Sequence, residues 1–509
     1  MKAETRLFFM TLFVFLISVY FAGAQDSITT LKLTFDQAWE QTSRNSHVMK
    51  QVQYLQQEKD MEAKATKGLY MPKVGISAVY MFMSDDLTLD LTPVKNTITP
   101  IYSALGNYGV FSGVPNPAAP TTVLPDNMST QAVRSQFKDG LQQIESADWN
   151  KMIQKKQFGT VAATFQWPIF LGGKIGVANK VAKIEQKETG EIARQKEGEL
   201  ISELTERYYG LCLAKQAICV RLDVFNGMDA HLHDAEKLQK EGLIANADVL
   251  HARLYHAQAE RELTKSRRTA GILNQALNNT MAMEKEASIE PISELFYLNS
   301  VDSLQYFKST AATKNPLLMQ VKIKKLMVEQ NYKAEKADYL PQVALQGMHN
   351  IVNKDLSPYT PTWMLGVGMK WTLFDGASRW RKVKSAYYKI NQVEEIKLKA
   401  ESDISTMVEK LYNELSMYSE QLKELESAKT FAEEYLRVRE KAFHEEMTNA
   451  TDVVDANLGL AQVRIERLQA MYGYDLTLAK LLQYSGIPEE FSNYRKRKDA
   501  KMESYKSEK

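Results

Sequence analysis

The chain has 509 residues, of which 44% are hydrophobic and 25% charged, and its 64 Lys and Arg residues balance 62 Asp and Glu residues. Such a length suits several compact domains or one very elongated molecule. The balanced charge gives no indication of nucleic-acid binding.

The N-terminus, residues 1–24, has the pattern of a secretory signal peptide. Two basic residues precede an apolar run from Leu7 to about Ala22, and small residues then supply a cleavage site before Gln25. The run is shorter than the ~20 residues of a membrane-spanning helix. We therefore expect export with cleavage, and a membrane anchor is the alternative. Beyond residue 24 we find no comparable apolar stretch, so a mature chain that entered a membrane would need the strands of a closed β-barrel.

The mature sequence contains two copies of one unit. Residues 241–262 and 445–466 align at an offset of 204 with eight identities, and the same offset superposes the W-x-x-F-x-G motifs that begin at Trp167 and Trp371. One register held over about 100 residues indicates a structural repeat. We expect the first repeat to cover 25–300 and the second to cover 301–487.

Each copy is predicted to contain two strands. In the first copy they cover about 74–83 and 157–167, and in the second about 343–351 and 363–371. The segment WMLGVGMKW (363–371) alternates apolar residues with glycines and a lysine, so its two faces differ completely. Strands of about ten residues have the length that a tilted membrane strand requires.

Tryptophans stand at the ends of two of these strands, as they do in the aromatic girdles of membrane barrels. We expect Trp167, Trp363 and Trp371 to be membrane-interface aromatics, with the apolar faces toward lipid and Lys370 toward a water-filled lumen. Four strands cannot close a barrel, so several chains would have to contribute. The alternative is an ordinary antiparallel sheet with one solvated face.

The first copy carries an insertion of about 65 residues between its strands, at about 84–150. It holds six of the 14 prolines of the chain together with many Asn, Thr, Ser and Gly residues. This is loop composition, and we expect an extracellular surface loop.

Very long helices are predicted over about 173–281 and about 376–484. No proline interrupts either range, and in the second copy apolar residues step by four and three as in a coiled coil. This seam consists of Ile404, Val408, Leu411, Leu415, Tyr418, Leu422 and Leu425. The first copy repeats it through Leu200, Leu204, Leu211, Ala214 and Ile218, with Arg207 as the exception.

The two cysteines, Cys212 and Cys219, are seven residues apart in this helical segment. Two helical turns separate them by roughly 10 Å, which is too far for a disulfide. We expect both to pack on one apolar face.

The order of these features resembles that of the TolC-like outer-membrane efflux proteins, over essentially all of residues 30–487. The resemblance rests on LTFDQAWEQTSRNS near the start, the two Y-x-P-x-V motifs, the W-x-x-F-x-G motifs, and the segments NADVLHA and TDVVDA. It implies a mainly α fold with a small β-barrel portion, a TolC-like trimeric α/β-barrel. Each of its two repeats would run helix, strand, strand, long helix, helix. A homotrimer would form a 12-stranded barrel in outer-membrane lipid and a helical barrel in the periplasm. Residues near 282–312 and the C-terminal region would form a waist around the helices.

The function implied by this resemblance is an exit duct. It would accept substrate from an inner-membrane pump through a periplasmic adaptor (a membrane fusion protein), in a tripartite efflux or type I secretion system. It would need no cofactor, metal or nucleic acid, and it would not be an enzyme. An exported coiled-coil assembly protein without a pore is the alternative. A hydrolase of the cell envelope would need a nucleophile or metal constellation, and we find none.

The resemblance also implies roles at the turns between the long helices. Asp452 and Asp455 fall at aspartates that ring the periplasmic entrance, while the first copy keeps Asp248 but has His251 in the other place. Capping of the first helical turn is the alternative role for each aspartate. Where family members carry an aromatic and an arginine that hold the closed tip, this chain has Phe443 and Thr448, so any closed state must be held differently.

The turns themselves are candidates for contact with the adaptor, because several of their residues are too apolar for isolated loop tips. Packing within the turn is the alternative. The residues are Gly242, Leu243, Ile244, Ala245, Asn246, Met447, Thr448 and Asn449.

The segment 488–509 is polar and basic. We expect it to be a mobile tail in the periplasm, and contact with an anionic surface is the alternative.

Overall fold

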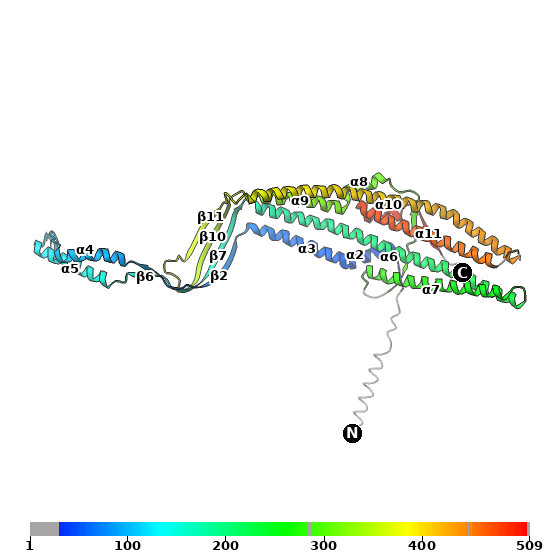
Figure 1. Ribbon diagram of the computed structural model, residues 1–509, viewed down its shortest axis with the longest axis horizontal. Helices are drawn as coiled ribbons and strands as arrows, with labels where there is room; N and C mark the ends of the chain where they lie inside the picture. The colour runs from blue at the N-terminus through cyan, green and yellow to red at the C-terminus, as the bar shows by residue number, and fades with distance from the viewer. Residues whose placement is uncertain (1–29, 284–286, 446, 449, 506–509) are drawn as a thin grey trace, which may run out of the picture. The chain divides into compact units, whose positions relative to one another are not determined.

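The computed structural model describes residues 30–283, 287–445, 447–448 and 450–505 (Figure 1). The predicted signal peptide lies outside these residues. The chain divides into two compact units, each of which takes segments from both repeats. The helical unit comprises the chain up to residue 64, 177–333, and the chain from 381 onward. The strand unit comprises 65–176 and 334–380.

Helices make up most of the helical unit, and four of them continue into the strand unit. Their bounds are α2 (Phe35–Asn45), α3 (His47–Lys67), α6 (Lys174–Lys240), α7 (Asn246–Thr280), α8 (Leu304–Lys314), α9 (Pro316–Ala337), α10 (Ser378–His444) and α11 (Ala450–Ser485). Both α6 and α10 have 67 residues, which corresponds to a length of roughly 100 Å. No helix in the described part of the chain is long and apolar enough to cross a membrane.

The apolar seams of the two long helices form the centre of the helical unit. Val408, Leu415 and Leu422 of α10 are buried, and they belong to the same hydrophobic cluster as Leu204 and Leu211 of α6. The seam residue that breaks the pattern, Arg207, is only half-buried. Both cysteines are unbridged, with Cys212 buried and Cys219 half-buried.

Short strands and an aromatic cluster lie beside these helices. Strand β1 (Thr30–Leu33) pairs in parallel with β8 (Ser288–Pro291). Next to it, Thr34 caps α2 through a hydrogen bond from the Gln37 amide, which is the capping box encoded in LTFDQAW. Tyr208 donates a hydrogen bond to the Leu33 carbonyl at 2.7 Å. The aromatic cluster consists of Phe35, Tyr208, Tyr209, Phe296 and Phe491.

The C-terminal segment is packed into this cluster, so the prediction of a mobile tail is wrong for its described residues up to 505. It forms η2 (Pro488–Glu490), α12 (Phe491–Arg495) and β12 (Ala500–Glu503), and β12 pairs with β9 (Leu295–Leu298). Phe491 and Tyr494 are buried, and Arg495 forms an ion pair with Asp36 at 3.1 Å. Lys496 also pairs with Asp36, and Arg497 pairs with Asp302 and Asp499, so these basic residues have acidic partners. This arrangement agrees with the waist that the family resemblance implies.

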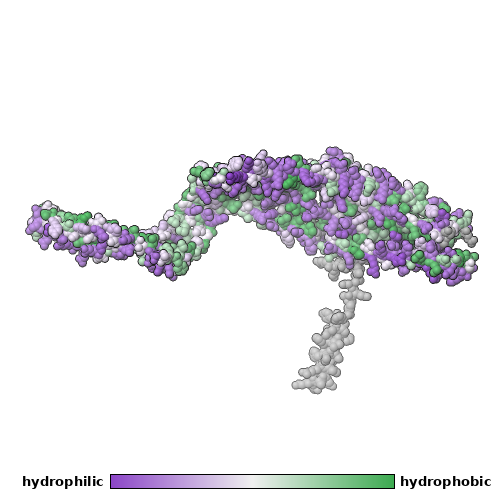
Figure 2. Space-filling view, in the orientation of Figure 1, coloured by the Kyte–Doolittle hydropathy of each residue, from purple (hydrophilic) through white to green (hydrophobic). Residues whose placement is uncertain are grey.

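The strand unit contains a four-stranded antiparallel sheet in the order β11-β10-β7-β2. Its strands are β2 (Lys73–Phe82), β7 (Gln157–Leu171), β10 (Gln342–Lys354) and β11 (Trp363–Lys370). All residues of β11 are exposed, and all of β2 are exposed except Ser77. Hydrophobic residues are visible on the face of the sheet in Figure 2. Within the described chain, β2 and β11 are each paired along one edge only.

The insertion between β2 and β7 is more ordered than its composition predicts. It contains β3 (Leu87–Asp90), α4 (Thr92–Tyr108), β4 (Pro115–Asn116), β5 (Ala119–Val123), α5 (Asp126–Ser146) and β6 (Asn150–Gln154). The expectation of a plain loop is wrong because of where the prolines lie. Pro93 stands in the first turn of α4 and Pro125 directly before α5, where a helix tolerates proline. Only Pro100 lies inside a helix.

Candidate entrance site at the helix tips

The turn between α6 and α7 is fixed by its own backbone. Gly242 has a φ of +77°, and its N–H donates to Gln239 while the Leu243 N–H donates to Leu238. These two bonds form a Schellman motif, which requires a left-handed residue at this position and explains the glycine. In the second copy the Met447 N–H donates to Ala442, again over five residues. The predicted contact residue Asn449 lies outside the described residues.

The apolar residues of the two turns have different environments. Leu243 and Met447 are 64% and 76% exposed. Ile244 instead packs within its own hairpin, against a small cluster that includes Val249 and Ala252. The two exposed side chains therefore remain candidates for contact with a partner, whereas Ile244 has the intramolecular role that was the alternative.

The three aspartates are in different states. The carboxylate of Asp248 is exposed and accepts a hydrogen bond from the Ala245 N–H at 3.1 Å, so it caps α7. Asp455 is exposed. Asp452 accepts a hydrogen bond from the Thr448 hydroxyl and forms an ion pair with Arg439 at 3.3 Å. The two aspartates of the second copy thus differ, because Arg439 neutralises the carboxylate of Asp452 whereas Asp455 is exposed.

Arg439 is the partner of Asp452 that the sequence analysis missed. It lies on α10, five residues before the helix ends at His444, and its guanidinium stacks 5.0 Å from the centre of the Tyr435 ring. The first copy has a comparable clamp, in which Arg253 reaches Glu236 across the α6–α7 hairpin at 2.8 Å. The hydrogen bond from Arg253 lowers the pKa of Glu236. Each pair joins two helices on opposite sides of a turn, so no local sequence pattern marks it.

Phe443 also has a defined partner in this structure. Its ring lies 6.1 Å from that of His231, on α6, in an edge-on arrangement. Burial lowers the pKa of His231, so the imidazole is neutral around pH 7. The phenylalanine therefore joins the two hairpins through an aromatic contact in place of a phenolic hydrogen bond. His251, which replaces the second aspartate in copy one, packs against Tyr255 at 4.7 Å.

The tryptophans of the strand unit hold equivalent positions in the two copies. The Trp167 indole N–H donates to the Tyr70 carbonyl at 2.9 Å, and that of Trp371 donates to the Tyr339 carbonyl at 3.1 Å. Each bond joins a W-x-x-F-x-G motif to a Y-x-P-x-V motif. All three predicted interface aromatics, including Trp363 at the other end of β11, are exposed in the single chain.

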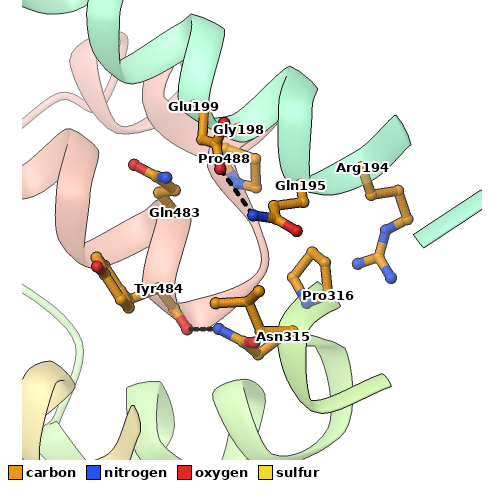
Figure 3. A pocket seen from close by; sticks show the side chains of 10 residues that line it. Arg194, Gln195, Gly198, Glu199, Asn315, Pro316, Gln483, Tyr484 and Pro488 are labelled. Carbon is orange, nitrogen blue, oxygen red and sulfur yellow. Dashed lines mark hydrogen bonds between the residues drawn. The ribbon is translucent and has the colours of Figure 1, made fainter. Parts of the chain in front are cut away.

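A small cavity in the helical unit offers no alternative site. It measures about 80 Å³, and Figure 3 marks hydrogen bonds between some of the polar residues around it. Asn315 donates to the Tyr484 carbonyl at 2.7 Å, and Gln195 donates to the Glu199 carboxylate at 2.8 Å. Ligand pockets usually exceed ~300 Å³, so this cavity is a packing feature where α6, α9 and the end of α11 meet. No group of three potential metal ligands occurs among the described side chains.

Comparisons with known proteins cover nearly the whole chain. Residues 308–487, within the second repeat, match the family described as "Outer membrane efflux protein". No curated protein matches the sequence. Several solved structures share the fold at low sequence identity. VceC, an outer membrane protein of Vibrio cholerae, is 13% identical with a TM-score of 0.62, and the match covers 89% of this chain and 96% of that one.

Two further channels give similar values. The CmeC outer membrane channel of Campylobacter jejuni is 10% identical with a TM-score of 0.64, over 91% of this chain and 88% of that one. The open MtrE outer membrane channel of Neisseria gonorrhoeae is 10% identical with a TM-score of 0.65, over 89% of each chain. These likenesses confirm the predicted fold class, with its repeated pattern of strands and long helices. Residues 308–487 thus match the outer membrane efflux protein family, and the chain shares the fold of these solved channels.

Proposed function

We propose that the chain is one protomer of a trimeric exit duct in the outer membrane. The duct serves a tripartite efflux or type I secretion system, in which a periplasmic adaptor and an inner-membrane pump deliver the substrate. The observation that carries this proposal is the sheet β11-β10-β7-β2, whose outer strands β2 and β11 are exposed and, within the described chain, paired along one edge only. Unpaired strand edges within a lipid phase are too costly to persist. Three copies would supply 12 strands and remove every edge.

The tryptophans support this assignment. Trp167 and Trp371 are tied to the backbone by their indole N–H groups while their rings remain exposed. An amphipathic ring with its polar atom satisfied suits the boundary between lipid and water. The duct itself would bind no nucleotide, and the energy for transport would come from the pump.

Purification of the mature protein from outer membranes, followed by conductance measurement in planar bilayers, tests the proposal. We expect a trimer that conducts ions. A water-soluble oligomer that does not conduct would overturn the duct and favour an exported coiled-coil assembly protein.

We further propose that Asp452 and Asp455 line the periplasmic entrance. Three-fold symmetry would gather six carboxylates there, of which the Asp455 groups are exposed and the Asp452 groups are paired with Arg439. Such a ring attracts cations, and bound cations or protons relieve its self-repulsion and favour closure. Asp248 would contribute from the first copy, although its carboxylate also caps α7.

The double variant Asp452→Ala, Asp455→Ala tests this entrance. It should raise cation conductance through the resting trimer and weaken block by divalent cations. Asp403→Ala is the matched control, because this aspartate is exposed on α10 and pairs with Lys399 one turn away on the same helix. Equal conductance and equal cation block in both variants would contradict the proposed role of Asp452 and Asp455 at the entrance.

We also propose that the exposed side chains of Leu243 and Met447 contact the adaptor. Contiguous exposed apolar surface marks sites of protein contact, and the proposed trimer would gather three copies of each side chain at its tips. Leu243→Glu with Met447→Glu should abolish binding of the purified trimer to its adaptor. Leu254→Glu is the control, because Leu254 is comparably exposed but lies about two turns further along α7. Equal binding by both variants would contradict the contact.

A further inference from the structure

The helical hairpin α4–α5, inserted between β2 and β7, has two well-packed helices. The Tyr102 ring lies 5.4 Å from that of Phe137, and Phe137 in turn stacks on Phe111 at 5.7 Å. Gly106 and Gly140 allow this close approach, because a side chain at either would meet Lys138 or Tyr102. Figure 1 shows the two helices side by side. The packing of the two helices therefore determines which residues of the hairpin face outward.

The two outer faces of the hairpin differ sharply. The face of α4 that turns away from α5 is exposed and uncharged, with residues that step by three and four as in a coiled-coil seam. It consists of Val94, Thr97, Ile101, Ala104 and Tyr108, flanked by Pro93 and Pro100. The exposed face of α5 is polar and carries Asp139, Gln142 and Glu145. Figure 2 shows hydrophobic and polar residues together along this part of the chain.

The exposed seam of α4 is not what a monomeric surface helix presents. Tyr108 is 81% exposed and Ile101 52%. The only charged residue of α4 is Lys95, whose amine reaches back to the Glu145 carbonyl of α5 at 3.1 Å. Without charges, the seam can meet a copy of itself with no repulsion between like groups. Heptad-spaced apolar residues are buried against partner helices when such helices associate.

We infer that the α4 seam is an interface between copies of this chain, in which three α4 helices pack against one another and the α5 helices face solvent. The inference rests on the proposed trimer. The hairpin leaves the sheet between β2 and β7, and β2 is one of the two strands whose outer edge is unpaired. An assembly that closes the sheet brings the roots of the three hairpins around one axis. The partner of the α4 seam is therefore the α4 seam of another protomer.

Cysteine cross-linking of the purified full-length trimer tests the inference. Ala104→Cys places a thiol on the seam, and Gln142→Cys places one on the exposed face of α5. A short bismaleimide should convert more than half of the Ala104→Cys protein into a covalent dimer on a denaturing gel. The Gln142→Cys protein should give at least fivefold less covalent dimer. The wild-type protein should do the same, and it reports on cross-linking through the two native cysteines.

Ile101→Glu provides a second measurement, because three carboxylates would then face one another on the seam. Added to Ala104→Cys, it should reduce cross-linking several-fold, whereas Gln142→Glu added to Ala104→Cys should not. Native mass spectrometry shows whether each variant remains a trimer. An intact trimer in which Ala104→Cys forms no cross-link, or forms one to a different protein, would overturn the proposed seam interface but not the proposed trimer. Absence of the trimer itself would overturn the proposed duct together with this inference.

Discussion

Arg439 and Asp452 face each other across the α10–α11 hairpin, and their side chains form an ion pair of 3.3 Å beside the turn. Both side chains are about one-third exposed. A pair with this exposure contributes little to global stability, ~0.2–1 kcal/mol. Its structural role is to hold the two arms of the hairpin together where they leave the turn.

Arg439→Gln should therefore loosen the tip without lowering the unfolding temperature appreciably. We expect faster amide hydrogen exchange in peptides that cover residues 440–455, because the arms separate more often. Arg437→Gln is the control, since Arg437 pairs with Glu434 on the same helix and joins no second arm. Equal exchange in the two variants would show that the clamp does not hold the tip.

The seam of α10 supplies a prediction about stability. Leu415 is 1% exposed, whereas Met417, two residues later, is 52% exposed. Leu415→Ala leaves a cavity among packed side chains and should cost ~2–5 kcal/mol. Met417→Ala should be close to neutral. Thermal unfolding of the two variants in detergent measures the difference, and similar midpoints would mean that the seam is not part of the core.

Periodicity explains why this part of the fold could be predicted from sequence. A step of four and three residues is a local property, and burial of Val408, Leu415 and Leu422 follows from it once any partner helix is present. The strands were predictable for the same reason, since the alternation of residue types in 363–371 is also a local property. The repeat then placed the corresponding elements of the first copy.

The residues that sequence reasoning missed depend on contacts between distant segments. Arg439 meets Asp452 only because the chain reverses between them, and Arg495 meets Asp36 from the opposite end of the sequence. Neither pair has a local signature. The helices of the insertion were missed for a different reason, because proline was counted as a loop residue without regard to its position. Pro93 and Pro125 stand where helices begin.

The packed C-terminal segment gives a third prediction, which concerns Arg467. Its side chain is 6% exposed and is held by Glu426 and Glu503 at 2.5 Å each. Burial disfavours the charged guanidinium, but the hydrogen bond and charge of Glu503 more than offset this, and the pKa of Arg467 is raised. Truncation after Asp499 removes β12 and leaves Glu426 as the acidic partner of this buried charge. The loss of stability should approach the ~3–5 kcal/mol expected when a buried pair is broken.

Deletion of residues 506–509 is the control for this truncation, because it retains β12 and Glu503. Urea unfolding of the two truncated proteins measures the difference. If the segment were a mobile tail, the two truncated proteins would unfold at the same urea concentration. That outcome would contradict the packing of β12.

Asp475 supplies a prediction about pH. Its carboxyl group is buried in the helical unit, where one oxygen accepts a hydrogen bond from the Phe296 N–H at 3.3 Å and the other has no partner among the described residues. Burial raises the pKa of Asp475 well above its ordinary value, and the positive charge of Arg495 opposes this only in part. The group is therefore protonated in the folded chain at pH values where it is ionised in the unfolded chain.

The sign of the effect follows from the protons bound in each state. Above pH ~4 the folded state holds a proton that the unfolded state has released. The contribution of Asp475 to stability is therefore largest at low pH and declines as pH rises toward the raised pKa. Asp475→Asn removes this dependence while keeping an acceptor for the Phe296 N–H. The variant should gain unfolding temperature relative to wild type at pH 8, and this gain should shrink at pH 5. Asp403→Asn, at an exposed position, should track wild type at both values. A constant offset between Asp475→Asn and wild type across this range would mean that the carboxyl group does not change protonation on folding.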